Sequence, residues 1–169
     1  MSAIAEALAE PRTRKVVLAV VDVLQRLTFW TESAGDWTSS TPHEVVGLRV
    51  SGQALDAADY TWNRAAGTVT AAAEQFGAGA DPRRVPVHAV VRLRLANLPK
   101  TLGGYQYRPA VSRLPDLSVR VEPRFGGLAQ VGGGALELFD DGTLADLRAL
   151  DWDGAEVRLY LGADLPRLP

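Results

Sequence analysis

The chain has 169 residues, of which 47% are hydrophobic and 22% are charged, and its formal net charge is −2 with an isoelectric point near 5.7. This length suits one compact domain with an ordinary core, and the composition is that of a globular rather than a disordered protein. The slightly acidic balance gives no general attraction to nucleic acid or to anionic lipid, so we expect neither as a partner. The absence of cysteine excludes disulfides, a thiolate nucleophile and cysteine-bound zinc. We also expect no secretory signal at the start and no membrane span.

Sixteen glycines and ten prolines are spread along the chain, which favours short strands and many turns over long helices. Residues 1–12 differ, because their alanine-rich stretch predicts a short helix or arm that begins after Ser2 and ends before Pro11. Residues 16–24 form a valine-rich run that predicts a buried strand. The polar, turn-rich residues 31–44 predict a loop.

A hairpin and a half-buried strand complete the first β-rich half, residues 13–98. Tyr60 and Trp62 alternate with polar residues, and a strand pattern resumes after Gly67, which we expect to supply the positive φ of the hairpin loop. Residues 87–95 alternate apolar side chains with polar or charged ones. That pattern is typical of an antiparallel strand with one face in the core.

Residues 99–116 contain three prolines, two glycines and two tyrosines without periodicity, which predicts an extended arm. Tyrosine and arginine are favoured at protein–protein interfaces, so we expect this arm, together with the N-terminal helix, to lie in contacts between subunits. The candidate interface residues are Tyr105, Tyr107, Arg108, Pro109, Arg113 and Leu114.

The remaining residues, 117–169, are expected to form a second β-rich half that closes the same domain. Strands are predicted at 117–124, 135–139 and 155–161, and a short helix at 143–150. A glycine-rich bend is expected to place the first two of these strands side by side. Structural turns are assigned to Gly67, Gly132, Gly133, Gly134, Gly142 and Gly154. The predicted fold is mainly β, an antiparallel β-sandwich or open barrel with a short N-terminal helix and one short helix near the C-terminus.

The sequence shows no recognisable active-site motif. The glycines at 132–134 have no lysine nearby and lead into a predicted strand, so they fit neither a P-loop nor a dinucleotide fingerprint. A hydrolase would have only His43 and His88 as histidine bases, without a nucleophile elbow. Calcium binding and simple turns both stay open for an acidic cluster made of Asp140, Asp141, Asp146, Asp151 and Asp153. We therefore expect no enzyme, no cofactor and no small-molecule substrate.

Arginine outnumbers lysine sixteen to two, and several arginines stand beside aromatic residues. Such pairs could stack on single-stranded nucleic acid, but they are equally typical of protein interfaces. The negative net charge favours the interface.

Residues 105–162 resemble a pattern found in tail-tip and baseplate proteins of long-tailed bacteriophages and prophages. In that pattern a tyrosine-and-proline segment leads to a strand, a glycine-rich bend, a Gly-x-Leu-x-Leu strand, a leucine-rich helix, an aromatic-Asp-Gly turn and a closing strand. The matching stretches are Tyr107-Arg108-Pro109, Gly132 to Gly134, "GALELFDDG", "TLADLRAL", "WDG" and "VRLYLG". Phe139 departs from the pattern, which more often has a polar residue there. The stretch "DYTWNRAAGTVTA" also resembles a ribbon of tail proteins.

The resemblance implies a structural component of a phage or phage-like tail tip or baseplate, a distal-tail or hub-like adaptor that forms a ring. Its partners would be other copies of itself and the neighbouring tube, hub and fibre proteins. It would be assembled in the host cytoplasm and reside in the virion tail. One alternative is a β-sandwich module that binds a glycan or receptor through aromatic residues, here Trp30, Trp37, Trp62 or Tyr105, although Trp62 and Trp152 are also expected in the core. A less favoured alternative is a cell-wall hydrolase.

Overall fold

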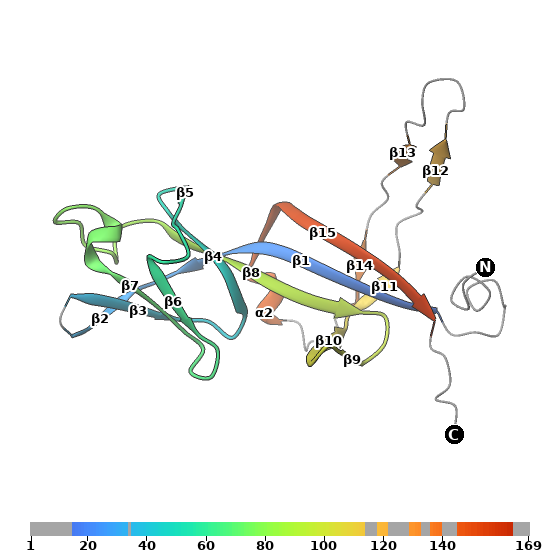
Figure 1. The fold of residues 1–169 in the computed structure, drawn as a ribbon, viewed down its shortest axis with the longest axis horizontal. Coiled ribbons are helices and arrows are strands. Elements are labelled where there is room, and N and C mark those ends of the chain that lie inside the picture. Colours follow the sequence, from blue (N-terminus) through green and yellow to red (C-terminus); the bar gives the residue numbers. More distant parts are fainter. Residues whose placement is uncertain are drawn as a thin grey trace. The chain divides into compact units, whose positions relative to one another are not determined.

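The computed structural model describes residues 15–33, 35–113, 118–121, 129–132, 136–139 and 145–163 (Figure 1). The described residues are mainly β, with one short α-helix, α2 (Ala145–Arg148), and one 3-10 turn, η1 (Ala73–Phe76). Most strand pairs are antiparallel, so the predicted mainly β fold is confirmed. The predicted helix in residues 1–12 lies outside the described residues.

The described residues divide into two compact units. Unit 1 contains residues 15–19, 94–113, 118–121, 129–132, 136–139 and 159–163, and unit 2 contains residues 20–33, 35–93 and 145–158. Three strands continue along the chain from one unit into the other: β1 (Lys15–Leu27), β8 (Val87–Ala96) and β15 (Asp151–Ala163). The largest sheet has the strand order β15-β1-β8-β10-β9, and β4 also pairs with β8.

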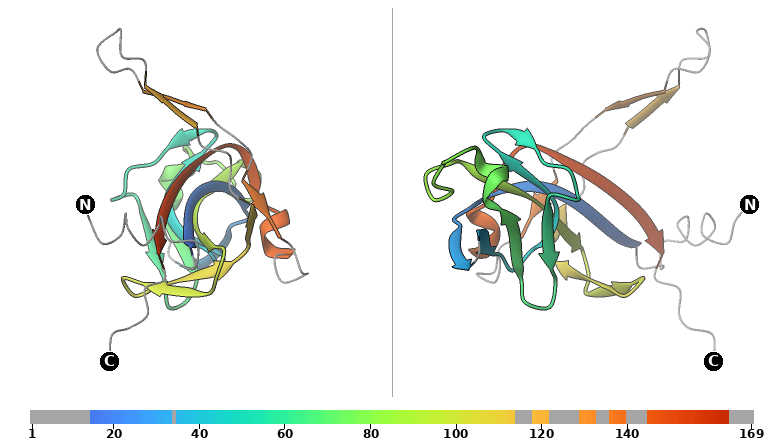
Figure 2. Two further views of the ribbon diagram at one scale, coloured as in Figure 1. Left: turned by 90° about the vertical axis from the view of Figure 1, so that its right-hand side faces the viewer. Right: turned by 60° about the vertical axis from the view of Figure 1, so that its left-hand side comes forward.

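Unit 2 contains a four-stranded antiparallel sheet in the order β2 (Trp30–Ser33), β3 (Asp36–Ser40), β7 (Thr68–Ala72) and β6 (Tyr60–Asn63). The predicted hairpin is the green β6–β7 pair of Figure 2, in which Asn63 faces Thr68 across a four-residue loop. Gly67 has a φ of 64°, as predicted for this loop. In the large sheet, β4 (Glu44–Val50) pairs with β8 and with β5 (Gln53–Ala54), both antiparallel.

The prediction of a loop over residues 31–44 is wrong, because β2 and β3 occupy most of it. The polar sequence of β3, "DWTSS", is not typical of a strand. Hydroxyl groups of this strand form hydrogen bonds inside the protein. The Oγ1 atoms of Thr38 and Thr70 are 3.1 Å apart, and the Ser39 hydroxyl donates to the Thr28 carbonyl at 2.8 Å. Since hydrogen-bonded polar groups can be buried at little cost, serine and threonine serve here as strand residues.

Strand β8 confirms the predicted alternation. In unit 2, Val87, Ala89 and Val91 are fully buried, while His88 and Arg92 are half-buried on the opposite face. The 16–24 strand is likewise confirmed as part of β1. Alternate side chains of both strands therefore supply apolar surface to the core, the usual consequence of a two-residue period.

Unit 1 contains the remaining strands, β9 (Lys100–Leu102), β10 (Tyr105–Pro109), β11 (Val111–Arg113), β12 (Ser118–Val121), β13 (Ala129–Gly132) and β14 (Glu137–Leu138). The expectation that a glycine bend pairs strands 117–124 and 135–139 is wrong. Strand β12 pairs with β13, and β14 pairs with β11. Gly132 is itself the last residue of β13 and faces Ser118, whereas Gly133, Gly134 and Gly142 lie outside the described residues.

The predicted C-terminal helix is confirmed over Ala145–Arg148, where Leu147 is buried. The last strand begins earlier than predicted, at Asp151 rather than residue 155. Gly154, assigned to a turn between elements, instead lies inside β15 with a φ of 68°. Because glycine adopts positive φ without steric cost, the strand continues through this irregular point.

Candidate functional site

The β9–β10 hairpin contains most of the predicted interface residues. Its strands pair Leu102 with Tyr105 and Tyr107 with Lys100, which leaves a two-residue turn at Gly103 and Gly104. The φ angles of these glycines are 59° and 79°. Positive φ at both central residues is the requirement of a type I′ turn, whose twist matches that of the paired strands. The prediction of an unpaired arm over 99–116 is therefore wrong for residues 100–113.

The hairpin is joined to the rest of unit 1 through backbone hydrogen bonds. Strand β10 runs parallel to β8, with Arg108 and Pro109 opposite Leu95 and Ala96. Immediately after it, the Ala110 amide donates to the Ala96 carbonyl at 2.8 Å, and the Phe139 amide donates to the Ala110 carbonyl at 2.7 Å. This pairing fixes the direction of the hairpin within the unit.

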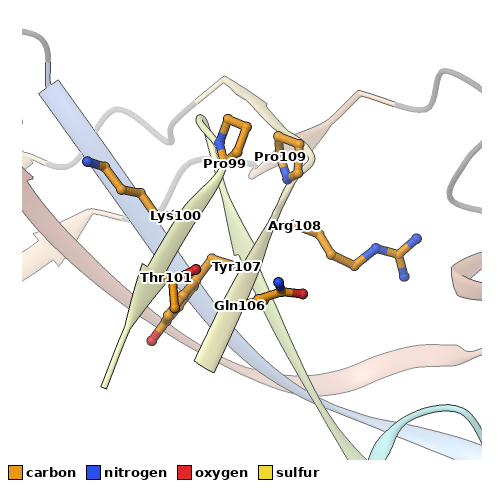
Figure 3. Close-up of a pocket in the computed structure, with 7 residues that line it drawn as sticks. All are labelled: Pro99, Lys100, Thr101, Gln106, Tyr107, Arg108 and Pro109. Atoms are coloured by element: carbon orange, nitrogen blue, oxygen red, sulfur yellow. The ribbon is translucent and has the colours of Figure 1, made fainter. Parts of the chain in front are cut away.

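A groove of about 360 Å³ lies along the hairpin (Figure 3). In Figure 3 the side chains of Lys100 and Arg108 extend in opposite directions, and those of Thr101, Gln106 and Tyr107 lie between them. The described residues that line the groove are thus two cations that point away from each other, an aromatic ring and hydrogen-bonding groups, and none of them is a carboxylate. Its lining residues are Pro99, Lys100, Thr101, Gln106, Tyr107, Arg108 and Pro109.

The structure places the predicted interface residues in two locations. Tyr107, Arg108 and Pro109 line the groove, and Tyr105 stands on the same strand beneath Arg94, whose guanidinium carbon is 3.8 Å from the ring centroid. This cation–π contact holds both side chains in place. Arg113 lies apart from the groove on β11, where its Nη1 is 3.6 Å from Glu137 Oε1, and Leu114 lies outside the described residues.

Sequence reasoning missed Arg94, Lys100, Thr101 and Gln106 as members of this site. The signal that would have revealed them is the Gly103-Gly104 pair, because Gly-Gly between residues that suit strands is a hairpin signature. Once residues 100–107 are taken as a hairpin, Lys100 and Thr101 must lie beside Tyr107 and Gln106.

A second polar cluster lies in unit 2, where Asp22 accepts hydrogen bonds from two arginines. Arg92 binds both carboxylate oxygens at 2.7 Å, and Arg158 Nη2 binds Oδ2 at 2.5 Å. The hydrogen bond from Arg92 is the main reason that the pKa of Asp22 lies below its usual value. Burial opposes this shift, and the charges of both arginines and the hydrogen bond from Arg158 add smaller contributions that lower the pKa. Glu44 faces Arg92 across the sheet, so charges alternate over β15, β1, β8 and β4. A carboxylate occupied in this way ties strands together and is not disposed to act as a general base.

The two histidines do not form a recognisable catalytic arrangement. His43 is 7% exposed, and its Nε2 lies 3.8 Å from Asp146 Oδ2, which connects the start of β4 to α2. His88 is on β8 opposite Arg49. Among the described residues, no three histidine, aspartate or glutamate side chains are grouped closely enough to hold a metal ion, and Asp140 and Asp141 lie outside them.

The tryptophans of the four-stranded sheet lie on different faces. Trp30 pairs with Thr38, whereas Trp37 and Trp62 belong to the adjacent rows, in line with Ala71 and Val69. Trp30 is 42% exposed, while Trp37 and Trp62 are half-buried and share their face with buried Val69 and Ala71. These three rings therefore do not form one exposed platform of the kind that stacks on a sugar. Trp152 is also half-buried, and its indole nitrogen donates to the Leu147 carbonyl at 2.9 Å.

No helix in the described part of the chain has the length and apolar character needed to cross a membrane. No protein family model, no curated protein and no solved structure matches this chain.

Proposed function

We propose that this protein is a structural component of a phage or phage-like tail tip or baseplate, and that it associates with copies of itself through the β9–β10 hairpin. The resemblance of residues 105–162 to tail-tip proteins supports this function, and the mainly β fold is compatible with it. The observation that carries the proposal is the hairpin itself.

The hairpin surface has the composition of a protein–protein contact. Tyr107 and Arg108 belong to the residue types enriched at interfaces, and Leu102, beside the turn, leaves 60% of its surface exposed. Leu102 faces Tyr105 across the hairpin, so an exposed apolar side chain lies beside an aromatic ring.

The pairing of β9 and β10 changes how the contact would be made. A flexible arm must lose conformational freedom when it clasps a neighbour, whereas a hairpin already paired to β8 presents a preformed surface. Preorganisation of this kind lowers the entropic cost of association. Subunits would therefore meet through the face of a hairpin rather than through an extended strand.

Light scattering coupled to size-exclusion chromatography tests the proposal on the full chain over about a hundredfold range of protein concentration. We expect the mass to rise with concentration to a defined oligomer, visible as uniform particles by electron microscopy. Leu102→Asp should raise the dissociation constant at least about tenfold, because a charge replaces an exposed apolar anchor.

Val157→Asp is the matched control, since Val157 is also an exposed apolar strand residue, 44% exposed, but lies on β15. It should leave the oligomer intact. A wild-type chain that remains monomeric throughout, or an equal loss in both variants, would contradict a contact made by the hairpin.

A further inference from the structure

One face of the four-stranded sheet in unit 2 carries hydroxyl and amide side chains in register. Residues opposite each other on neighbouring strands project on the same side of a sheet, so the strand pairing defines two rows across this face. The other face contains the buried Val69 and Ala71 and belongs to the core. The first row contains Trp30, Thr38, Thr70 and Thr61, and the second row contains Ser40, Thr68 and Asn63.

The two rows carry no charged side chain, although protein surfaces are usually rich in them. Among the described residues that are paired across this face, the one charged residue is Asp36, at the start of β3 and outside the two rows. Ser40, Thr61 and Asn63 are nevertheless exposed to solvent. The face is therefore accessible and neutral, and it offers a charged ligand no electrostatic attraction.

Hydrogen bonds hold polar groups of the rows in place. The Oγ1 of Thr38, a buried residue, lies 3.1 Å from the Oγ1 of Thr70. Asn63 Oδ1 accepts hydrogen bonds from the amides of Ala65 and Ala66, both at 3.1 Å, so its Nδ2 is the half of the side chain that can donate to a ligand. Polar groups that are already fixed lose little conformational freedom when a ligand binds.

An exposed indole ring ends the first row. Trp30 leaves 42% of its surface exposed, and it stands three strand spacings from Thr61, which is about 14 Å. A pyranose sugar has C–H groups that stack on an aromatic ring and hydroxyl groups that exchange hydrogen bonds with neighbouring side chains, so a ring beside hydroxyl and amide groups suits it. The length of the row suits an oligosaccharide better than a single sugar.

We infer that this face binds an uncharged polysaccharide chain. The ligand is identified by complementarity, because a neutral, hydroxyl-rich surface with one stacking ring matches a neutral, hydroxyl-rich polymer. Trp37 and Trp62, which lie on the other face, are not needed. The inference goes beyond the proposed function and does not use the β9–β10 hairpin. The residues assigned to this hydroxyl face are Trp30, Ser40, Thr61, Asn63, Thr68 and Thr70.

Isothermal titration calorimetry of the full chain tests the inference, with cellohexaose, maltohexaose, laminarihexaose and chitohexaose as the probes. We expect at least one of these neutral oligosaccharides to bind. Trp30→Ala should weaken that binding at least about tenfold, because the stacking surface is lost. Thr61→Val keeps the β-branched shape but removes the hydroxyl, so it should weaken binding about threefold to tenfold.

Tyr160→Ala and Thr101→Val are the matched controls. Tyr160 is an exposed aromatic residue on β15, and Thr101 is an exposed threonine on β9. Both variants should bind the oligosaccharide like the wild type. Trp30→Phe should retain most of the affinity, which separates the loss of an aromatic ring from a defect in folding.

The outcomes distinguish this inference from the proposed function. Absence of binding to every probe overturns the inference, and so does equal weakening by Trp30→Ala and Tyr160→Ala. If Trp30→Ala or Thr61→Val lowers the mass of the oligomer in light scattering and leaves oligosaccharide binding unchanged, the face is a contact between subunits and the inference is wrong. Leu102→Asp should lose self-association and retain oligosaccharide binding, so failure of one proposal leaves the other standing.

Discussion

At the scale of single residues, Asp22 connects its own strand, β1, to β8 and β15 through hydrogen bonds from two arginines. It is 12% exposed and lies between Arg92 and Arg158, and the Nε of Arg158, buried without a hydrogen bond, is 3.3 Å from Glu156. Removing the carboxylate would leave two guanidinium groups without their main acceptor. Breaking a buried ion pair from one side is costly because the remaining charge stays desolvated.

We predict that Asp22→Asn lowers the free energy of unfolding by about 3 kcal/mol at neutral pH, measured by urea denaturation. Arg84→Ala is the control, because the Arg84 side chain is 89% exposed and its ion pair with Asp81 is long at 3.9 Å. It should change the free energy of unfolding by less than about 0.5 kcal/mol.

The difference in unfolding free energy between the wild type and Asp22→Asn should depend on pH. The pKa of Asp22 in the folded protein is depressed, chiefly by the hydrogen bond from Arg92, so its stabilisation is present above the unfolded pKa and is lost as pH falls through the folded value. The gap in stability between wild type and Asp22→Asn should therefore narrow below a pH of about 3.9. A gap that stays constant across the acid range would show that the carboxylate's charge is not responsible.

A second residue-scale prediction concerns Gly67, whose φ of 64° and surroundings both favour glycine. A Cβ there would lie 3.0 Å from the Thr41 carbonyl oxygen, and the Gly67 carbonyl accepts a hydrogen bond from the Thr41 amide at 2.9 Å. Gly67→Ala should lower the free energy of unfolding by about 1–2 kcal/mol because of the backbone conformation, and further because the new Cβ approaches the Thr41 carbonyl oxygen. Gly79→Ala, with a φ of 72° and nothing within 4 Å of the added Cβ, should show the conformational cost alone. Equal losses in thermal or urea unfolding would argue against the contact.

At the scale of elements, the β9–β10 turn determines whether the groove exists. Both Gly103 and Gly104 have positive φ, and asparagine is accepted at the first position of such turns. We predict that Gly103→Asn leaves stability and self-association nearly unchanged, whereas Gly104→Val destabilises the hairpin by about 1–2 kcal/mol and weakens association. Hydrogen exchange of the β10 amides measures the first effect. Unchanged protection in Gly104→Val would contradict a turn that requires positive φ.

At the scale of the whole molecule, three strands belong to both units, so we expect the units to unfold together. All four tryptophans lie in unit 2, whereas Leu95, which is fully buried, lies in unit 1. Leu95→Ala should lower the free energy of unfolding by about 2–5 kcal/mol, because it leaves a cavity in the core. The urea midpoint reported by tryptophan fluorescence should then fall as far as the midpoint reported by far-ultraviolet circular dichroism. A fluorescence transition that Leu95→Ala does not move would show that unit 2 unfolds independently.

The parts of the fold that the sequence predicted are those with local causes. The alternation of side chains in β8 was sufficient to assign a strand and its buried face. Tyrosine and tryptophan followed by Gly67 were sufficient to assign the β6–β7 hairpin and its turn. The β9–β10 hairpin also has a local cause, the Gly103-Gly104 turn. It was not predicted because the neighbouring prolines suggested an extended arm instead. Strand β3 was missed because its polar sequence is typical of a loop. Its hydroxyl groups form hydrogen bonds with Thr70 and Thr28, and these contacts could not be predicted from neighbouring residues.

Short, mostly antiparallel strands joined by glycine turns could be predicted from the amino-acid sequence, since side-chain period and positive φ are properties of neighbouring residues. The choice of strand partners is seen in the three-dimensional structure alone: β10 runs parallel to β8, β13 rather than β14 pairs with β12, and Asp22 contacts two arginines far along the chain. A strand's pattern specifies its faces but not its neighbour, because backbone hydrogen bonds are the same for every partner.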